Sequence, residues 1–244
     1  MNRLLHTTYW DIVRQYRNGF YFVTVLIVAL LVVLLRQLDG VDWRLWWPAI
    51  LLETLVVNSF FFMAGLVLLE KGEGVLEAQV VTPLRDWEYL LAKIISLFVL
   101  SAGESLALIL LVSGPAFNWL WMLIGIGCFV AMYTLYGFFV VARYDSISEF
   151  ILPSALWTMG FSIPLLPYFD LWQHWLLYLH PLQAPLILVE AAYKPLPAWQ
   201  LWYGILYSLV WISIGWVVGR HTFYRFVVTK EGSRRRSVSL ARSL

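Results

Sequence analysis

Six long apolar runs constrain the fold of this chain more than any other feature of its sequence. Each run is too long for a single β-strand, and none alternates with the period of two that marks the strands of a membrane barrel. Because a helix of about 20 apolar residues crosses a bilayer, the runs predict an all-α, polytopic membrane protein with six transmembrane helices. The runs are residues 20–35, 46–69, 89–112, 119–141, 147–166 and 201–219.

The composition supports the same fold class. Of the 244 residues, 61% are hydrophobic and 13% are charged, whereas an average soluble chain has about 25% charged residues. This shortfall excludes an ordinary soluble domain, a disordered chain and a nucleic-acid-binding module. The single cysteine, Cys128, excludes internal disulfides and a metal site built from several cysteines. The positions of the apolar runs divide the chain into three parts. We expect a terminal helix at 1–19, a six-span domain at 20–219 and a basic tail at 220–244.

Lysine and arginine are distributed unevenly between the two sides of the predicted domain. Of the 17 such residues, all except Arg36, Arg44 and Lys194 fall on the side that holds both termini. Because positive residues accumulate in cytoplasmic loops, this asymmetry predicts that both termini are cytoplasmic. Tryptophans gather at the opposite boundary, as an interfacial aromatic belt does. They are Trp43, Trp46, Trp47, Trp119, Trp121, Trp172, Trp175, Trp199 and Trp202.

Residues 171–192, within the outer segment 170–198, are apolar enough to span but do not fit the charge pattern. A seventh span would place the arginine-rich tail outside the cell. Pro181 and Pro185 also interrupt the stretch, and proline breaks helices. We therefore expect one or two short outer-leaflet helices that dip in and return, which is tolerated only where protein covers the broken backbone.

Residues 4–18 form a predicted amphipathic helix at the cytoplasmic surface. Its apolar residues follow the i, i+4, i+7, i+11 spacing of one helix face, and Asp11 and Arg14 lie off that stripe. Gly19 suits the end of this helix before the first span. The helix is either a simple membrane anchor or a lever joined rigidly to the first span. The stripe consists of Leu5, Tyr9, Ile12 and Tyr16.

The loop between the second and third spans, residues 70–88, is longer than a connector needs to be. Two glycines end the second span, and residues 75–81 are long enough for two helical turns. Thr82 and Pro83 then suit the N-cap and the first position of the next helix. A short apolar helix needs a surface that buries it, which is either a cytoplasmic partner or the lipid.

The loop also carries a family resemblance. An acidic residue after the second span is followed by glycine, Leu-Glu, Thr-Pro-Leu, an aromatic residue and Leu-Leu-x-Lys. Together with the six-span plan, this pattern resembles the ABC-2 class of ABC transporter permeases over nearly the whole chain. The nearest subgroups are the small permeases resembling fluoroquinolone-export permeases and, second, the haem-exporter membrane subunits. The pattern comprises Glu70, Glu73, Gly74, Leu76, Glu77, Thr82, Pro83, Leu84, Trp87, Glu88, Tyr89, Leu90, Leu91 and Lys93.

The resemblance implies a transport subunit that is not itself an enzyme. In this class the loop helix docks in a groove of an ATPase subunit, and the N-terminal helix acts as a lever. This chain has no Gly-x-x-x-x-Gly-Lys-Ser/Thr phosphate loop, so ATP and Mg²⁺ are expected on a separate ATPase chain, with no cofactor on this one. The implied coupling residues are Glu70, Glu73, Gly74, Leu76, Glu77, Thr82, Pro83, Leu84 and Trp87.

The resemblance also implies partners, a location and a direction of transport. The expected partners are two ATPase copies, a second permease chain that is identical or a paralogue, and membrane lipids, but no nucleic acid. The expected location is the inner membrane of a prokaryote. The implied function is export of a hydrophobic or amphipathic small molecule, or a lipid-like substrate, out of the cytoplasm or inner leaflet.

Three polar residues inside the spans are candidates for the substrate path. Glu53 and Asn58 lie in the second span and Glu104 in the third, where an ionisable side chain costs about 2.5–3.5 kcal/mol at the bilayer centre. The two carboxylates are able to approach and share a proton, which suits a cationic substrate, a proton relay or a hydrogen bond to a partner chain. The alternative is a bond to a neighbouring helix. Lys93 is expected to snorkel toward water and is assigned to no site.

Two other functions compete with the permease hypothesis. A stand-alone channel or carrier explains the spans but not the short loop helix. A six-span intramembrane hydrolase is suggested by Ser162 in Gly-Phe-Ser-Ile, which resembles the Gly-x-Ser-Gly of rhomboid proteases without its final glycine. That reaction needs a base such as His174 or His180 within hydrogen-bond reach of the serine.

Overall fold

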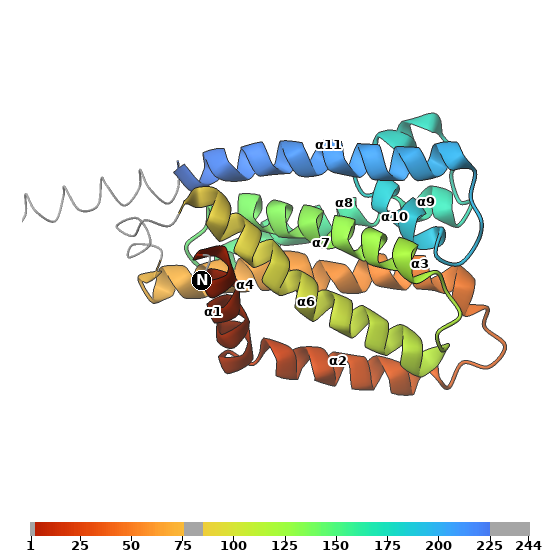
Figure 1. Cartoon of the computed structure of the whole chain (residues 1–244), viewed down its shortest axis with the longest axis horizontal. Helices are drawn as coiled ribbons and strands as arrows, with labels where there is room; N and C mark the ends of the chain where they lie inside the picture. The colour runs from red at the N-terminus through yellow and green to blue at the C-terminus, as the bar shows by residue number, and fades with distance from the viewer. Residues whose placement is uncertain (1–2, 76–84, 225–244) are drawn as a thin grey trace, which may run out of the picture.

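The computed structural model describes residues 3–75 and 85–224, and within them all regular structure is helical. Figure 1 shows the long helices running side by side. Five helical segments are long and apolar enough to span a membrane, and the bent pair α1–α2 makes six if it counts as one span. The all-α polytopic fold is thereby confirmed. The elements are α1 (Arg3–Arg17), α2 (Phe20–Leu35), α3 (Trp43–Leu55), η1 (Val56–Phe61), α4 (Phe62–Gly72), α6 (Asp86–Val112), α7 (Trp119–Val141), α8 (Ile147–Phe161), α9 (Leu165–Tyr168), η2 (Trp175–Leu179), α10 (Gln183–Glu190) and α11 (Ala198–Thr222).

The two ends of the bundle hold different parts of the chain. One end, called the N-terminal end below, holds α1, the end of α4, the start of α6 and the end of α11 (Figure 1). The opposite end, called the far end, holds the α2–α3 connection and the short helices α9 and α10. The residues before and after the loop at 70–88 therefore lie beside α1.

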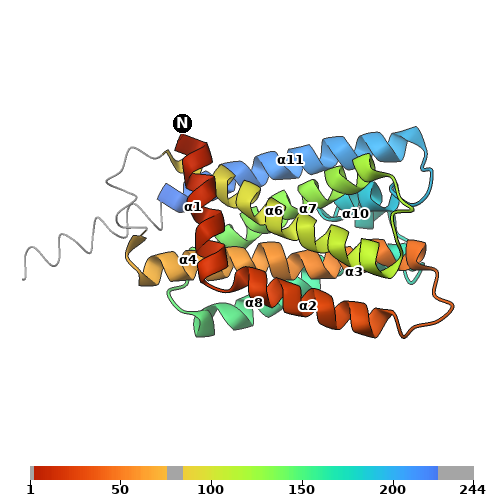
Figure 2. The same ribbon diagram turned by 60° about the horizontal axis from the view of Figure 1, so that its bottom comes forward.

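α1 and α2 meet at Gly19 with a bend of 62°. The φ of Gly19 is +79°, a left-handed conformation that glycine adopts without strain. Figure 2 shows α1 lying across the neighbouring helices instead of continuing along α2. The predicted apolar stripe points away from the bundle, whereas the polar face packs inward. Exposed residues are Leu5, Tyr9 and Tyr16, and buried ones are Thr8, Asp11 and Gln15.

The second span is one helical stretch, Trp43–Gly72, with a π-helical segment in its middle. This segment, η1, lies where α7 approaches most closely. A Cβ added at Gly137 would lie 2.7 Å from the carbonyl oxygen of Phe60. No side chain fits there, so glycine sets the distance between the two helices.

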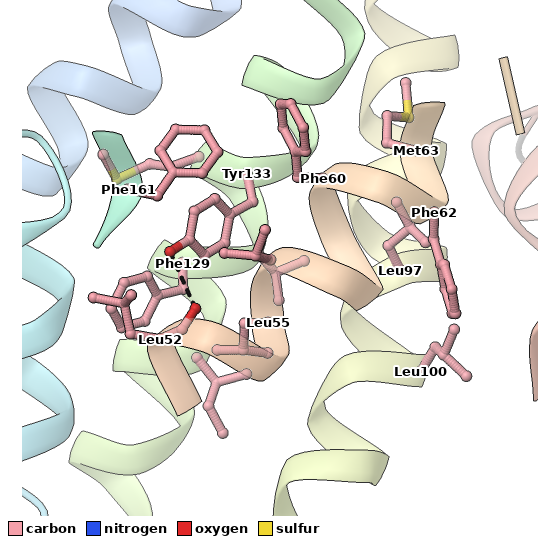
Figure 3. Packing of buried hydrophobic residues seen from close by; sticks show 14 of the residues in the cluster. Leu52, Leu55, Phe60, Phe62, Met63, Leu97, Leu100, Phe129, Tyr133 and Phe161 are labelled. Carbon is pink, nitrogen blue, oxygen red and sulfur yellow. Dashed lines mark hydrogen bonds between the residues drawn. The ribbon is translucent and has the colours of Figure 1, made fainter. Parts of the chain in front are cut away.

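Aromatic and aliphatic side chains from η1 and the helices around it fill the centre of the bundle (Figure 3). The ring of Phe161 lies 5.2 Å from Phe60 and 5.1 Å from Tyr133. The Tyr133 hydroxyl donates to the carbonyl oxygen of Leu52 at 3.2 Å, shown as the dashed line in Figure 3. A polar group in the apolar core is thus hydrogen-bonded, as buried polar groups generally are.

The outer segment at 171–192 forms no seventh span in the described structure. It folds into η2 and the buried helix α10, which packs against α7 and α11. A Cβ added at Gly125 would lie 2.9 Å from the backbone nitrogen of Val189. Protein therefore covers α10 on the sides that face α7 and α11, as a re-entrant segment in a membrane requires.

The start of the third span differs from the prediction. α6 does not begin at Pro83 but at Asp86, because its N-cap residue Arg85 has an extended backbone with φ −82° and ψ 147°. The Glu88 carboxylate accepts a hydrogen bond from the Arg85 backbone N–H at 2.9 Å. The helix is capped by this acidic side chain, which also lies in the first turn where the helix dipole favours it.

The predicted tryptophan belt also needs one correction. Trp47 is fully buried, and its Nε1 donates to the Ser113 Oγ at 2.8 Å. Its ring therefore ties α3 to the end of α6 and does not face lipid. Trp46, its neighbour, is exposed and contacts the ring of Phe169 at 5.2 Å.

The helices α8 and α11 lie on the outer sides of the bundle, as α2 also does. Only 22% of the apolar part of Ile147–Tyr168 and 17% of that of Ala198–Thr222 are buried, compared with 72% for α7. The outward faces of these helices are apolar, so lipid or another protein covers them in a membrane.

Candidate functional site

Five side chains form a buried network at the N-terminal end, called the ionic cluster below. Lys93 on α6 donates from Nζ to Asp11 Oδ1 on α1 at 2.7 Å and to Glu70 Oε1 on α4. Arg14 on α1 donates to the same Glu70 oxygen. The Tyr89 hydroxyl donates to the other Glu70 oxygen, Oε2, at 2.7 Å. The cluster thus joins the N-terminal helix to the helices on both sides of the loop.

The spacing of these residues explains how the cluster forms. Asp11 and Gln15 are four residues apart, so they share one face of α1. Lys93 and Ser96 are three apart and share the facing side of α6. The Gln15 amide donates to Ser96 Oγ at 2.9 Å, next to the Asp11–Lys93 pair. Two polar faces therefore meet, while the apolar stripe of α1 is turned outward.

The charges of the cluster balance one another. Two cations, Arg14 and Lys93, face two carboxylates, and the side chains of Lys93 and Glu70 are 0% exposed. Removing one partner of a buried ion pair leaves an uncompensated charge and costs about 3–5 kcal/mol. The second oxygen of Asp11, Oδ2, has no partner among the described residues. The cluster is therefore held tightly at Glu70 and more loosely at Asp11.

This geometry corrects the interpretation of Lys93 and changes that of Glu70. Lys93 does not snorkel toward water, because it is fully buried and Asp11 and Glu70 neutralise it. Glu70 was expected on a surface that contacts an ATPase, but its side chain is also fully buried. Glu70 therefore does not present its carboxylate to a partner protein. It acts on a partner only through the side chains that bind it, Arg14, Tyr89 and Lys93.

Both sides of the loop are also fixed to the rest of the bundle. At the start of the loop, Lys71 Nζ donates to the carbonyl oxygens of Ala142 at 2.9 Å and Tyr144 at 2.6 Å. Near its end, Asp86 Oδ2 accepts from Arg220 Nε on α11 at 2.7 Å. Together with the ionic cluster, these contacts connect the two ends of the loop to α1, α7 and α11.

Of the other predicted coupling residues, Glu73 is exposed, and Gly74 and Trp87 are partly buried. Gly74 has a φ of +69°, a left-handed turn that favours glycine. It lies in the turn directly after α4. The rest of the predicted set lies outside the described residues, namely Leu76, Glu77, Thr82, Pro83 and Leu84.

The intramembrane carboxylates have different surroundings. Glu53 is exposed on the side of α3, and its Oε1 accepts from the Ser162 hydroxyl at 2.7 Å. Glu104 is buried, and its Oε2 has no partner among the described residues. No hydrogen bond joins the two carboxylates in the described structure, so shared protonation has no geometric support. Asn58 in η1 is buried with both amide atoms unpaired within the same residues.

The geometry around Ser162 does not match the hydrolase hypothesis. Its hydroxyl contacts a carboxylate, Glu53, and not an imidazole. His174 and His180 accept backbone hydrogen bonds at Nδ1, from Leu176 at 3.2 Å and Leu182 at 3.3 Å. Burial lowers the pKa of His180 to about 4, against a smaller opposing effect of the Gly160 carbonyl. Both histidines therefore hold the outer segment in place.

Four members of the cluster were not predicted as site residues from the sequence, namely Asp11, Arg14, Tyr89 and Lys93. The sequence does contain a pattern that indicates the cluster. Asp11 and Gln15 are four residues apart and lie on the side of α1 away from the apolar stripe. A polar face on a helix that lies at a membrane needs either water or buried partners. The lysine at the start of an otherwise apolar span would have been a suitable partner.

Comparisons with known proteins agree with this architecture. Residues 2–231 match the model of the fluoroquinolones export permease protein family. Two curated proteins, each named fluoroquinolones export permease protein and found in the CDC 1551 and H37Rv strains of Mycobacterium tuberculosis, are each 31% identical over 188 residues. The aligned region covers 76% of this chain and 79% of each relative. The chain therefore belongs to the fluoroquinolones export permease family and is an ABC-2-type membrane permease.

Proposed function

We propose that this chain is the membrane subunit of an ATP-driven exporter, with both termini in the cytoplasm of a prokaryote and the bundle in the inner membrane. The N-terminal end then faces the cytoplasm, where a separate ATPase binds the loop at 70–88. Lysine and arginine support this orientation, since among the described residues only Arg36, Arg44 and Lys194 lie at the far end. The family membership supports export.

The ionic cluster is the observation that carries the proposal. It connects α1 to α4 directly before the loop and to α6 directly after it. A force applied to the loop therefore reaches α1 through Glu70 and Lys93. α1 then transmits it through the bend at Gly19 to α2. This path makes α1 a lever instead of a simple anchor.

The proposed assembly contains two permease chains and two ATPase chains, which carry ATP and Mg²⁺. The second permease chain is a copy of this one or a paralogue, and lipid surrounds both. The substrate is a hydrophobic or amphipathic molecule taken from the cytoplasm or the inner leaflet. The relatives are named for export of fluoroquinolones, which are small organic molecules of this general kind.

Co-purification tests the proposal. The chain is co-expressed with a candidate ABC ATPase chain from the same organism, purified in nanodiscs and assayed for vanadate-sensitive ATP hydrolysis. We expect a stoichiometric complex that is lost when residues 76–84 are replaced by a glycine-serine linker of equal length. A permease that purifies without an ATPase, yet conducts or carries solutes in liposomes, would contradict the proposal and support a channel or carrier.

A control variant separates loss of docking from loss of folding. Lys194→Met removes an ion pair with Glu190 at the far end, where the Lys194 side chain is 56% exposed. Exposed pairs contribute little to stability, so this variant should form the complex at the normal level. The linker variant should elute as a monodisperse permease even though it has lost the ATPase.

A further inference from the structure

Glu53 is a carboxylate on the outside of the bundle, within a membrane-spanning helix. It lies ten residues after Trp43, the first residue of the span, which is about 15 Å along the helix axis. It is exposed, and the Ser162 hydroxyl is its one recorded hydrogen-bond donor among the described residues. No lysine, arginine or histidine of those residues forms a salt bridge with it.

Three apolar side chains share a helix face with Glu53. Trp46, Ile50 and Val57 follow the spacing of that face. Trp46 is 45% exposed and Val57 37% exposed. Ile50 is partly buried against the core, so the chain covers the stripe only in part and leaves Trp46, Glu53 and Val57 exposed.

Neighbouring elements border this stripe with more apolar surface. On the α8–α9 side it is flanked by Phe169, whose ring contacts Trp46, and by Ser162. The surface at Glu53 therefore combines the rings of Trp46 and Phe169, the aliphatic side chain of Val57 and one carboxylate.

Lipid chains cannot solvate a carboxylate, so a residue in this position faces a group that compensates its charge. One hydroxyl from Ser162 supplies only one hydrogen bond to one of the two oxygens. The π-helical segment η1 begins three residues after Glu53, and such segments occur often at functional sites. Glu53 thus differs from the rest of the lipid-facing surface in its carboxylate and in its closeness to a π-helical segment.

We propose that Glu53 binds the positively charged nitrogen of an amphipathic substrate, whose apolar part lies along the stripe between α3 and α8. Ser162 positions the carboxylate through its hydrogen bond, and the ring of Trp46, two helical turns away, contacts the apolar part of the substrate. This inference rests on the proposed export function and specifies the substrate class that the exporter binds. It assigns no role to Glu104, which is buried inside the bundle.

Two fluorescent probes test the inference on the purified permease–ATPase complex in nanodiscs. Ethidium is a permanently cationic aromatic probe, and N-phenyl-1-naphthylamine is a neutral one. Glu53→Gln should weaken ethidium binding about tenfold or more, because it removes a partly desolvated charge pair. It should leave the affinity for the neutral probe within twofold of that of the parent chain. Glu53→Asp, which keeps the charge, should retain most of the ethidium affinity.

Matched variants make the result specific to this position. Ser162→Ala should weaken ethidium binding less than Glu53→Gln does, since the charge remains. Glu149→Gln, at the start of α8 and outside the apolar stripe, should bind both probes normally. Equal loss of both probes in Glu53→Gln, or no loss of either, would overturn the inference. A change from permease pairs to single permease chains in Glu53→Gln would also overturn it, because Glu53 would then contact the second chain.

The outcome is distinguishable from failure of the proposed function. Probe binding is measured without ATP, so it reports on Glu53 even when transport is absent. If the parent complex binds ethidium through Glu53 but couples no ATP hydrolysis to export, the proposed function fails and the binding site stands. If export of the neutral probe is ATP-driven and the ethidium affinity does not depend on Glu53, the export function stands and the binding inference fails.

Discussion

Lys93 of α6 and Glu70 of α4 form an ion pair in which both side chains are 0% exposed. The residues flank the loop that we propose as the docking site of an ATPase. Their second partners, Asp11 and Arg14, come from α1. The pair therefore joins the two helices that border the loop and, through Asp11 and Arg14, connects them to the N-terminal helix. We propose that movement of the loop reaches α1 along this connection.

Replacing Lys93 tests how strongly the cluster holds the N-terminal end together. Lys93→Met leaves Asp11 and Glu70 with less compensation and should destabilise the protein by about 3–5 kcal/mol. Thermal unfolding in detergent measures the loss. Adding Glu70→Gln to Lys93→Met should recover part of it, because the uncompensated carboxylate is gone. Additive losses in the double variant would show that the two side chains are not coupled.

Gly19 should tolerate few other residues. Its φ of +79° is left-handed, and a Cβ added there has nothing within 4 Å, so only backbone strain opposes substitution. Gly19→Ala should cost about 1–2 kcal/mol, and Gly19→Asn less, because asparagine tolerates this conformation better. Thermal unfolding midpoints of both variants check the order. Equal stability of Ala, Asn and Gly variants would mean that the bend is not fixed at this residue.

Gly137 should be intolerant of alanine for a steric reason. Its added Cβ would lie 2.7 Å from the Phe60 carbonyl oxygen, whereas one at Gly127 on the same helix would meet only Phe98 at 3.6 Å. Gly137→Ala should therefore destabilise the bundle by about 1–3 kcal/mol, the usual cost of overpacking. Gly127→Ala should be neutral or slightly stabilising, because alanine favours helix. Unfolding in detergent compares the two, and similar effects would contradict the close contact between η1 and α7.

His180 should make stability depend on pH. Burial lowers its pKa in the folded protein to about 4 from an ordinary value of 6.5, so the unfolded chain binds the proton more readily. Its contribution is fully present above pH 6.5 and is lost as the pH falls from 6.5 toward 4, in total about 3 kcal/mol. Unfolding midpoints at pH 7.5 and 5 should differ less in His180→Gln than in the parent chain. An equal pH difference in the two proteins would contradict this contribution of His180.

Much of the fold follows from hydrophobic patterning, because a membrane span has few alternatives to a helix. The runs at 119–141 and 147–166 correspond closely to α7 and to α8–α9. The packing of polar faces is not determined in this way. Whether Asp11 meets water, lipid or Lys93 depends on how α1 crosses α6, and the stripe of one helix does not specify its neighbour.

Two features of the local backbone geometry also cannot be predicted from the sequence. The π-helical η1 depends on contact with Gly137 on another helix. The start of α6 at Asp86, three residues after the helix-favouring Pro83, depends on which side chain caps it. Both features are settled by tertiary contacts that short-range propensity does not contain.

The amount of substrate exported per ATP hydrolysed tests the central claim most directly. Asp11→Asn keeps the shape of the side chain and leaves the Lys93–Glu70 pair intact, but it weakens the link from α6 to α1. The account predicts that the purified complex bearing Asp11→Asn still hydrolyses ATP at close to the parent rate, while export per ATP falls about tenfold. The Lys194→Met complex should keep the parent ratio. An unchanged ratio in Asp11→Asn would contradict transmission of the ATPase movement through the ionic cluster.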